Sequence, residues 1–240
     1  MGRTLWENAA ADLRGPDAAA TVDPIVWDHS TRVARLTEAI IAMPEVANHV
    51  LDRTALKAAA LYHDAGWLLE LWSGEISAEQ LLGRPTSDEQ RDRAADWMTR
   101  RLANVLELNR LRLAARTIRE CNNRSTTLLE ARILADAENL DQIGPQAIWF
   151  MVRRQQAQRR TFADMLQTWQ RQQQYGYWPA RIKECLTFPS SRQLAQDRYQ
   201  MMSRFMDDLA ATLGNEPVAV PETPAEQADP NLLIASRVHN

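Results

Sequence analysis

The stretch LKAAALYHDAG, residues 56–66, decides how this sequence folds. It reads as an amphipathic helix, and at helical spacing His63 falls on the apolar face while Asp64 falls beside it. The other members of that face are Leu56, Ala59 and Ala60. We therefore predict a core helix over 52–65 that stops at Gly66 and carries two ionisable groups into the protein interior.

The same helical periodicity extends over most of the chain. Gly is scarce, with 8 residues, and the alternation of β-branched residues that is typical of strands is nearly absent. Proline and glycine mark several boundaries; the pair Asp23-Pro24, for example, opens a helix that Pro44 ends. Besides 52–65, we expect helices at 24–44, 88–104, 107–121, 126–144, 146–174 and 190–213. Short connections join most of them, which predicts an all-α fold, a compact helical bundle.

The pattern predicts one folded domain between two dissimilar ends. We expect this domain to span 24–213, preceded by an N-terminal extension at 1–23 and followed by a tail at 214–240. The tail contains NEPVAVPETPAEQADP, which is rich in Pro and Ala and has little apolar surface to bury. Such a composition is typical of disorder.

Composition excludes several classes of protein. Hydrophobic residues make up 45% and charged residues 25% of the chain, and the net charge is -3. With a pI near 5.9, the chain has no positive field for nucleic acids or anionic membranes. The two cysteines, Cys121 and Cys185, are too few for a disulfide framework. Neither a signal peptide nor an apolar run near the ~20 residues of a membrane helix is found, so we expect a cytoplasmic protein without a membrane partner.

Two more predicted helices place an ionisable group where an apolar side chain is expected. His29 precedes Val33, Leu36 and Ile40 on the stripe of one helix, and Asp136 lies with Leu129, Ile133 and Leu140 on the stripe of another. A buried, unpaired carboxylate is costly, so Asp136 requires an Arg or a cation as its partner. Two histidines and two carboxylates brought together would be satisfied by a metal ion such as Mn, Fe, Co, Ni or Zn.

Three motifs carry a resemblance to a known family. DHSTRVARL at 28–36, LKAAALYHDAG at 56–66 and ILADAENLDQIG at 133–144 resemble, in this order, the motifs of the HD-domain superfamily of metal-dependent phosphohydrolases. The late segment SSRQLAQDRYQMMSRFMDDL also looks like the terminal helix of the bacterial branch. The resemblance covers about residues 24–212 and implies a helical bundle of the HD-domain type.

The resemblance also implies a site and a reaction. One divalent metal ion (Mn, Fe, Co, Ni, Zn or Mg) would be held by His29, His63, Asp64 and Asp136. The expected function is hydrolysis of a small phosphoester, most naturally a nucleotide, by a metal-activated water. Asp64 and Arg32 are then the candidate catalytic residues, and Arg32 and Arg124 the candidate substrate-binding residues.

The sequence departs from the family at Cys121 and Asn122, which stand where many relatives carry further histidines. This departure argues against a two-metal site, and it keeps open a catalytically idle HD domain that serves as a metal- or nucleotide-binding regulatory module. A di-iron oxygenase would need about six ligands, more than the 4 histidines support.

A nucleic-acid-binding module is the remaining alternative. It would rest on the arginines and aromatic residues of the segment 150–178. We favour an amphipathic helix there, whose Phe150, Phe162, Leu166 and Trp169 face the bundle. The oligomeric state is left open by the sequence.

Overall fold

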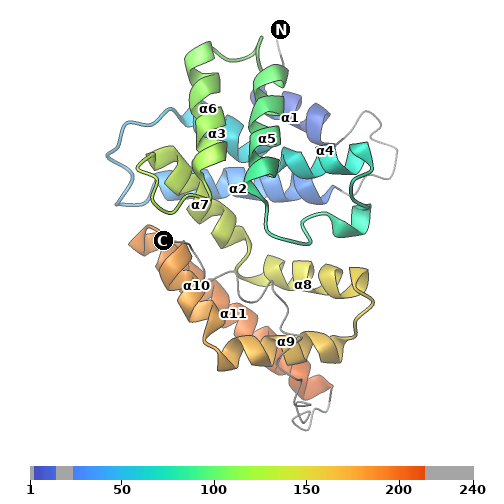
Figure 1. The fold of residues 1–240 in the computed structure, drawn as a ribbon. Helices are drawn as coiled ribbons and strands as arrows, with labels where there is room; N and C mark the ends of the chain where they lie inside the picture. The colour runs from blue at the N-terminus through green and yellow to red at the C-terminus, as the bar shows by residue number, and fades with distance from the viewer. Residues whose placement is uncertain (1–2, 15–23, 214–240) are drawn as a thin grey trace.

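A computed structural model describes residues 3–14 and 24–213, and every regular element in these ranges is helical (Figure 1). The expected all-α fold is thereby confirmed. The helices are α1 (Leu5–Leu13), α2 (Ile25–Ile41), α3 (Arg53–Tyr62), α4 (Ala65–Ser73), the 3-10 helix η1 (Ala78–Gln80), α5 (Asp88–Arg101), α6 (Leu108–Glu120), α7 (Leu129–Asp141), α8 (Pro145–Ala157), α9 (Phe162–Gln174), α10 (Tyr177–Cys185) and α11 (Pro189–Thr212).

The helices form two groups (Figure 1). In the first, α3 is central and packs against α1, α2, α5, α6 and α7, and its residues from Ala58 to Tyr62 are all buried. In the second group, α8, α9, α10 and α11 pack against one another. Helix α7 belongs to the first group and also contacts α10 and α11, so it joins the two.

The helix expected over 52–65 is α3, which ends earlier, at Tyr62; His63 and Asp64 form a turn, and α4 begins directly after it at Ala65. Gly66 does not end a helix; it lies inside α4. A Cβ atom on Gly66 would lie 2.4 Å from the backbone oxygen of Gln90 in α5, so glycine is needed there for close helix packing. Gly66 was expected as the end of a helix, whereas in the structure it allows α4 to pack closely against α5.

The single helix expected over 146–174 is also wrong, since α8 and α9 are separate. Arg159 adopts a positive φ of 55° in the connection between them. Thr161 then starts α9 with a capping box, in which its side chain accepts from Asp164 N and the Asp164 carboxylate accepts from Thr161 N. The other expected helices are confirmed to within one helical turn.

Three α-helices were not expected, α1, α4 and α10, nor was the short helix η1. Helix α1 lies within the segment expected as an extension, begins with a capping box of Thr4 and Glu7, and packs on α2 and α3. Its Asp12 accepts a hydrogen bond of 2.6 Å from the Tyr62 hydroxyl. Residues 15–23 and the predicted tail at 214–240 lie outside the described residues.

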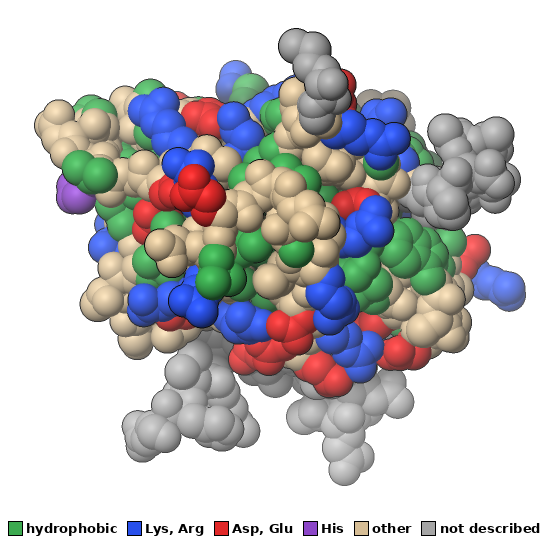
Figure 2. Space-filling model, turned by 90° about the horizontal axis from the view of Figure 1, so that it is seen from above, with side chains coloured by type: hydrophobic (Ala, Val, Ile, Leu, Met, Phe, Trp, Pro, Cys, Tyr) green, Lys and Arg blue, Asp and Glu red, His purple; other side chains and the backbone are tan. Residues whose placement is uncertain are grey.

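The surface of the described chain mixes charges of both signs. On the face seen in Figure 2, basic and acidic side chains are interspersed. Ion pairs join neighbouring helices, for example Arg119 of α6 with Asp92 of α5 at 2.9 Å. None of the described helices combines the length and the apolar character that crossing a membrane requires.

Candidate metal centre

The core of the candidate site is the turn between α3 and α4. His63 ends α3 and Asp64 begins α4, so the two side chains are not held 100° apart as on a continuous helix. His29 reaches the same place from α2. All three side chains are almost completely buried, at 3% exposure for His29, 0% for His63 and 2% for Asp64.

Three potential ligand atoms converge in this place. The Nε2 atoms of His29 and His63 are 3.2 Å apart, and Asp64 Oδ2 lies 3.3 Å from the first and 3.6 Å from the second. Atoms that share one metal ion at about 2.1 Å, with ligand–metal–ligand angles of about 90–115°, are separated by about 3.0–3.5 Å. The three atoms therefore have the spacing of ligands on one face of a metal ion.

The outer nitrogens of both imidazoles are hydrogen-bonded. Nδ1 of His29 donates to Asp141 Oδ2 at 2.8 Å, and Nδ1 of His63 donates to the backbone oxygen of Ala60, also at 2.8 Å. With the hydrogen on Nδ1, each Nε2 presents a lone pair toward Asp64 Oδ2. Three acceptors pointing at one another require a cation or a proton between them, so the donor set fits a divalent metal ion.

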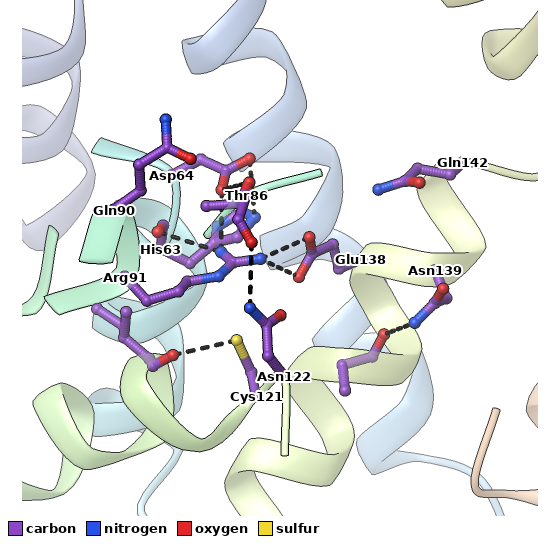
Figure 3. Close-up of polar contacts among 12 residues, drawn as sticks. His63, Asp64, Thr86, Gln90, Arg91, Cys121, Asn122, Glu138, Asn139 and Gln142 are labelled. Atoms are coloured by element: carbon purple, nitrogen blue, oxygen red, sulfur yellow. Dashed lines mark hydrogen bonds and ion pairs between the residues drawn. The ribbon is translucent and has the colours of Figure 1, made fainter. Parts of the chain in front are cut away.

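The second oxygen of Asp64 is engaged elsewhere. Asp64 Oδ1 accepts hydrogen bonds from Thr86 Oγ1 at 3.0 Å and from Arg91 Nη1 at 2.9 Å (Figure 3). Burial raises the pKa of Asp64, but the electrostatic interactions with His63 and Arg91 and the hydrogen bond with His29 outweigh it and hold that pKa well below its usual range. Because Oδ1 is engaged by Thr86 and Arg91, Oδ2 is the oxygen of Asp64 that faces the two imidazoles and would bind a metal ion.

The two histidines differ in their affinity for protons. Burial lowers the pKa of both. For His29 the hydrogen bonds to Asp141 and Asp64 outweigh burial and raise the pKa to about 9, whereas for His63 the burial effect prevails. Without a metal, a proton on Nε2 of His29 therefore satisfies the three acceptors, and a metal ion would have to displace it.

Asp136, the fourth expected ligand, is not brought to this group. Its carboxylate accepts the backbone N–H groups of Thr187 at 2.7 Å and Phe188 at 3.1 Å, just before α11 begins. The group of potential ligands that lies together comprises His29, His63 and Asp64. Asp136 is buried, as expected, but the partners in the structure are two amides of the chain.

This contact predicts a structural effect. Asp136→Ala leaves the N–H groups of the half-buried Thr187 and the buried Phe188 without their acceptor, so we expect the free energy of unfolding to fall by about 2–4 kcal/mol. We also expect metal stoichiometry to remain that of the wild type. Denaturant unfolding and elemental analysis of the same preparations measure both quantities. A folded Asp136→Asn protein that has lost its metal would return Asp136 to the ligand set.

The two arginines expected at the site lie differently. Arg32 is next to the centre: its Nε and Nη2 donate to Asp141 at 2.8 and 3.0 Å, and its guanidinium lies 5.5 Å from the ring centre of Phe150. Its side chain is 32% exposed, so N–H groups can still reach a ligand. Arg124 is exposed, and its Nη2 contacts Cys185 Sγ at 3.3 Å, at the end of α10.

Cys121 and Asn122 directly follow α6, at its C-terminal end. The Cys121 thiol is buried, and burial raises its pKa to about 12, which keeps it neutral. Asn122 donates to the backbone oxygen of Thr86 at 3.2 Å (Figure 3). Both residues therefore line the surroundings of Asp64 without contributing a charge.

A large cleft adjoins the centre. It has a volume of about 1000 Å³, its walls are residues 76–84 and helix α8, and four of its lining side chains are arginines: Arg84, Arg153, Arg154 and Arg159. The lining ring of Phe150 lies 6.3 Å from the ring of His29. On the other wall, Trp67 Nε1 donates to Thr86 Oγ1 at 3.0 Å, and Thr86 in turn holds Asp64. Phe150 thus connects the cleft to His29, and Trp67 connects it through Thr86 to Asp64.

Two charged residues of the centre, Arg91 and Glu138, were not predicted from the sequence. Arg91 is 1% exposed, donates through Nη1 to Asp64, and through Nη2 to both oxygens of Glu138 at 2.6 Å. A signal for Arg91 existed, because it stands at helical spacing before the apolar positions Ala94, Ala95 and Met98 of α5. Only the fold, however, shows which carboxylates it meets.

Comparisons with known proteins agree with this arrangement. The sequence model of one family, described as HD domain, matches residues 26–143. By sequence, no curated protein matches the chain.

Three crystal structures of Bacillus subtilis YpgQ are similar in fold, each at 18% sequence identity. The complex of YpgQ with ADP has a TM-score of 0.53 and covers 87% of this chain and 92% of that one. YpgQ alone has a TM-score of 0.54, with 88% and 98% covered, and its selenomethionine form has 0.54, with 92% and 100%. The likeness in fold therefore extends over both groups of helices.

Proposed function

Because the chain belongs to the HD-domain superfamily of metal-dependent phosphohydrolases, we propose that it hydrolyses a small phosphoester with one divalent metal ion held by His29, His63 and Asp64. The observation that carries the proposal is the convergence of three potential ligand atoms within 3.2 to 3.6 Å of one another in a buried turn. A bound divalent metal would supply an activated water, because it lowers the pKa of its water ligand toward neutrality.

The protein residues supply orientation and charge. Asp141 and the Ala60 carbonyl fix the ring orientations of His29 and His63, and partners of this kind tune metal affinity as well as geometry. Thr86 and Arg91 turn Asp64 so that Oδ2 faces the two imidazoles. Arg32 is a half-buried cation beside this group, and we propose that its exposed N–H groups bind the phosphoryl group of the substrate.

The cleft supports a nucleotide as the substrate. Its arginines offer bidentate hydrogen bonds to phosphate oxygens. Its aromatic residues Trp149 and Phe150 offer faces on which a base can stack, and Trp149 is 60% exposed. The volume of about 1000 Å³ accommodates a nucleotide. A protein of the same fold, YpgQ, crystallises with ADP, which is a ligand of this class.

A direct assay tests the proposal. The purified protein, freed of metal and reloaded in turn with Mn, Co, Ni, Zn or Mg, is incubated with nucleoside mono-, di- and triphosphates and with simple sugar phosphates. We expect release of phosphate or pyrophosphate from at least one nucleotide, and its loss on chelation. Metal binding without turnover of any phosphoester would leave the alternative, a regulatory module.

That alternative has one observation in its favour. With a proton on His29, whose pKa is raised to about 9, the buried charges of the centre balance without a metal. The negative groups are Asp64, Glu138 and Asp141. The positive groups are Arg32, Arg91 and the protonated His29. A catalytically idle domain would bind nucleotide with measurable heat and return it unchanged.

Metal removal should lower stability. The proposed ligands lie on α2 and on the turn between α3 and α4, so the metal binds the folded state only. At a free metal concentration of 100 times Kd, binding contributes about 2.7 kcal/mol, which corresponds to about 5–10 °C in Tm for a chain of this size. Thermal unfolding before and after dialysis against a chelator measures the shift. An unchanged Tm after verified metal removal would contradict a metal site in the core.

A further inference from the structure

Arg91 of α5 holds a guanidinium group inside the protein, with its residue only 1% exposed. On one side, Nη1 donates to Asp64 Oδ1 at 2.9 Å and to the backbone oxygen of His63 at 3.1 Å. On the other side, Nη2 donates to both carboxylate oxygens of Glu138 at 2.6 Å. In Figure 3 the guanidinium lies between the two carboxylates.

A charge in this position cannot be neutralised by losing a proton. Arginine remains protonated in proteins, and an isolated buried cation is very costly, so Asp64 and Glu138 are needed to compensate it. No part of the guanidinium is available to a ligand from the cleft, since the side chain is 1% exposed. Arg91 therefore acts on the centre itself and does not bind substrate.

Asp64 is shared between two cation positions. Its Oδ2 faces the imidazoles of His29 and His63, at 3.3 and 3.6 Å, and its Oδ1 faces Arg91. A carboxylate that uses one oxygen for each of two cations is the arrangement found between paired metal ions, which stand about 3.5–4 Å apart. Here the second position is filled by a side chain of the protein.

The second position is surrounded by groups that could bind a metal. Besides Asp64 Oδ1 they are the Glu138 carboxylate and Thr86 Oγ1, which also contacts Asp64 Oδ1. Carboxylate and hydroxyl oxygens are suitable ligands for a cation in this position. The guanidinium of Arg91 satisfies the two carboxylates instead, without metal.

We propose that Arg91 is a built-in second cation. It binds Oδ1 of Asp64 and the carboxylate of Glu138, and by occupying this position it confines the centre to a single metal ion. The inference rests on the metal site proposed above and is independent of whether the protein hydrolyses a phosphoester. Arg91 is a positioning residue in this sense, because it reaches the metal only through Asp64.

Metal stoichiometry tests this role directly. Arg91→Ala removes the charge and opens space between Asp64 and Glu138, while Arg91→His replaces the charge by a neutral imidazole ligand. We expect wild type to take up about one Mn²⁺ per chain, and each of these variants about two, measured by isothermal titration and by elemental analysis after desalting. Arg91→Lys retains the cation and is expected to stay at one.

A further pair of variants identifies the ligand of the additional ion. Glu138→Gln in the wild-type background should keep one ion per chain, because Glu138 is the partner of Arg91 there and not a metal ligand. Combined with Arg91→His, Glu138→Gln should reduce two ions to one. Should Arg91→Ala fail to fold, Arg91→His and its double variant carry the test alone.

The outcomes separate the inference from the site on which it rests. Wild type without any bound metal would refute the metal site itself. One ion in wild type and also in folded Arg91→Ala and Arg91→His would overturn the inference and leave the site intact. Loss of the single ion in Glu138→Gln, with the fold preserved, would overturn it as well, because Glu138 would then be a ligand and not the partner of Arg91.

Discussion

Asp64→Asn is expected to lower the affinity for the metal ion by at least about 100-fold, while the protein stays folded. The two oxygens of Asp64 have different partners. Oδ1 accepts hydrogen bonds from Thr86 Oγ1 and Arg91 Nη1, and an amide NH₂ group accepts neither. The amide oxygen of the Asn side chain must therefore take the place of Oδ1.

The consequence is that the NH₂ group turns toward the two imidazoles. There it donates hydrogen bonds to the Nε2 atoms of His29 and His63, where the metal would bind. The substitution thus replaces one of the three acceptors by a donor to the other two and removes the need for a cation. The buried acceptors remain satisfied, but Arg91 loses the charge of one of its two carboxylate partners, so we expect the stability of the metal-free protein to be unchanged or lower.

Isothermal titration with Mn²⁺ and chemical unfolding of the metal-free proteins measure the two effects. Asp92→Asn is a matched control, because Asp92 lies on the surface of α5 and pairs with Arg119. It should bind metal as the wild type does. An Asp64→Asn protein that binds Mn²⁺ within about fivefold of wild type would show that the contacts of Oδ1 do not decide the orientation of the amide.

His63→Ala should lose metal and activity together. His63 is completely buried, and its Nε2 lies 3.2 Å from that of His29, so its removal leaves His29 and Asp64 as the remaining pair of proposed ligands. Two side chains hold a divalent ion far more weakly than three, and we expect a loss of at least about 100-fold in affinity. The hydrolysis of the nucleotide found in the assay should fall with occupancy.

The comparison requires a histidine variant that leaves the centre unchanged. His49 is exposed in the connection between α2 and α3, so His49→Ala serves this purpose. Both variants are assayed at several metal concentrations, with occupancy measured on the same samples. If His63→Ala keeps one metal ion per chain but loses turnover, His63 is not a ligand and acts on the reaction in another way.

The helices and the buried character of the centre could be predicted because they depend on local periodicity. His29 lies at helical spacing before Val33, and His63 follows Ala59 and Ala60 in the same way, so each must face the interior of the bundle once the helix forms. The motifs then identified the family, which the match to residues 26–143 confirms. Neither step needs to know how the helices are placed relative to one another.

The breaks between helices were harder to predict. The turn at His63 and Asp64 is stabilised from outside the segment, by the hydrogen bond from Arg91 to the His63 carbonyl and by the packing of Gly66 against α5. Such contacts leave no local signature. The boundary before α9 did leave one, the capping box that begins at Thr161, but the continuing run of Arg and Gln obscured it.

Helix α7 shows most clearly which features the sequence predicts and which features depend on the tertiary structure. Its three carboxylates at the centre and beside it have three different partners: Asp136 the N–H groups before α11, Glu138 the guanidinium of Arg91, and Asp141 the side chains of His29 and Arg32. The sequence by itself determined that α7 is a helix with Asp136 facing inward, because the helical period sets the direction of each side chain around the axis. The packing of α2, α5 and α11 around α7 decided which carboxylate meets a backbone amide, an arginine or a histidine. The direction of a side chain around its own helix does not specify which group of another helix it will contact.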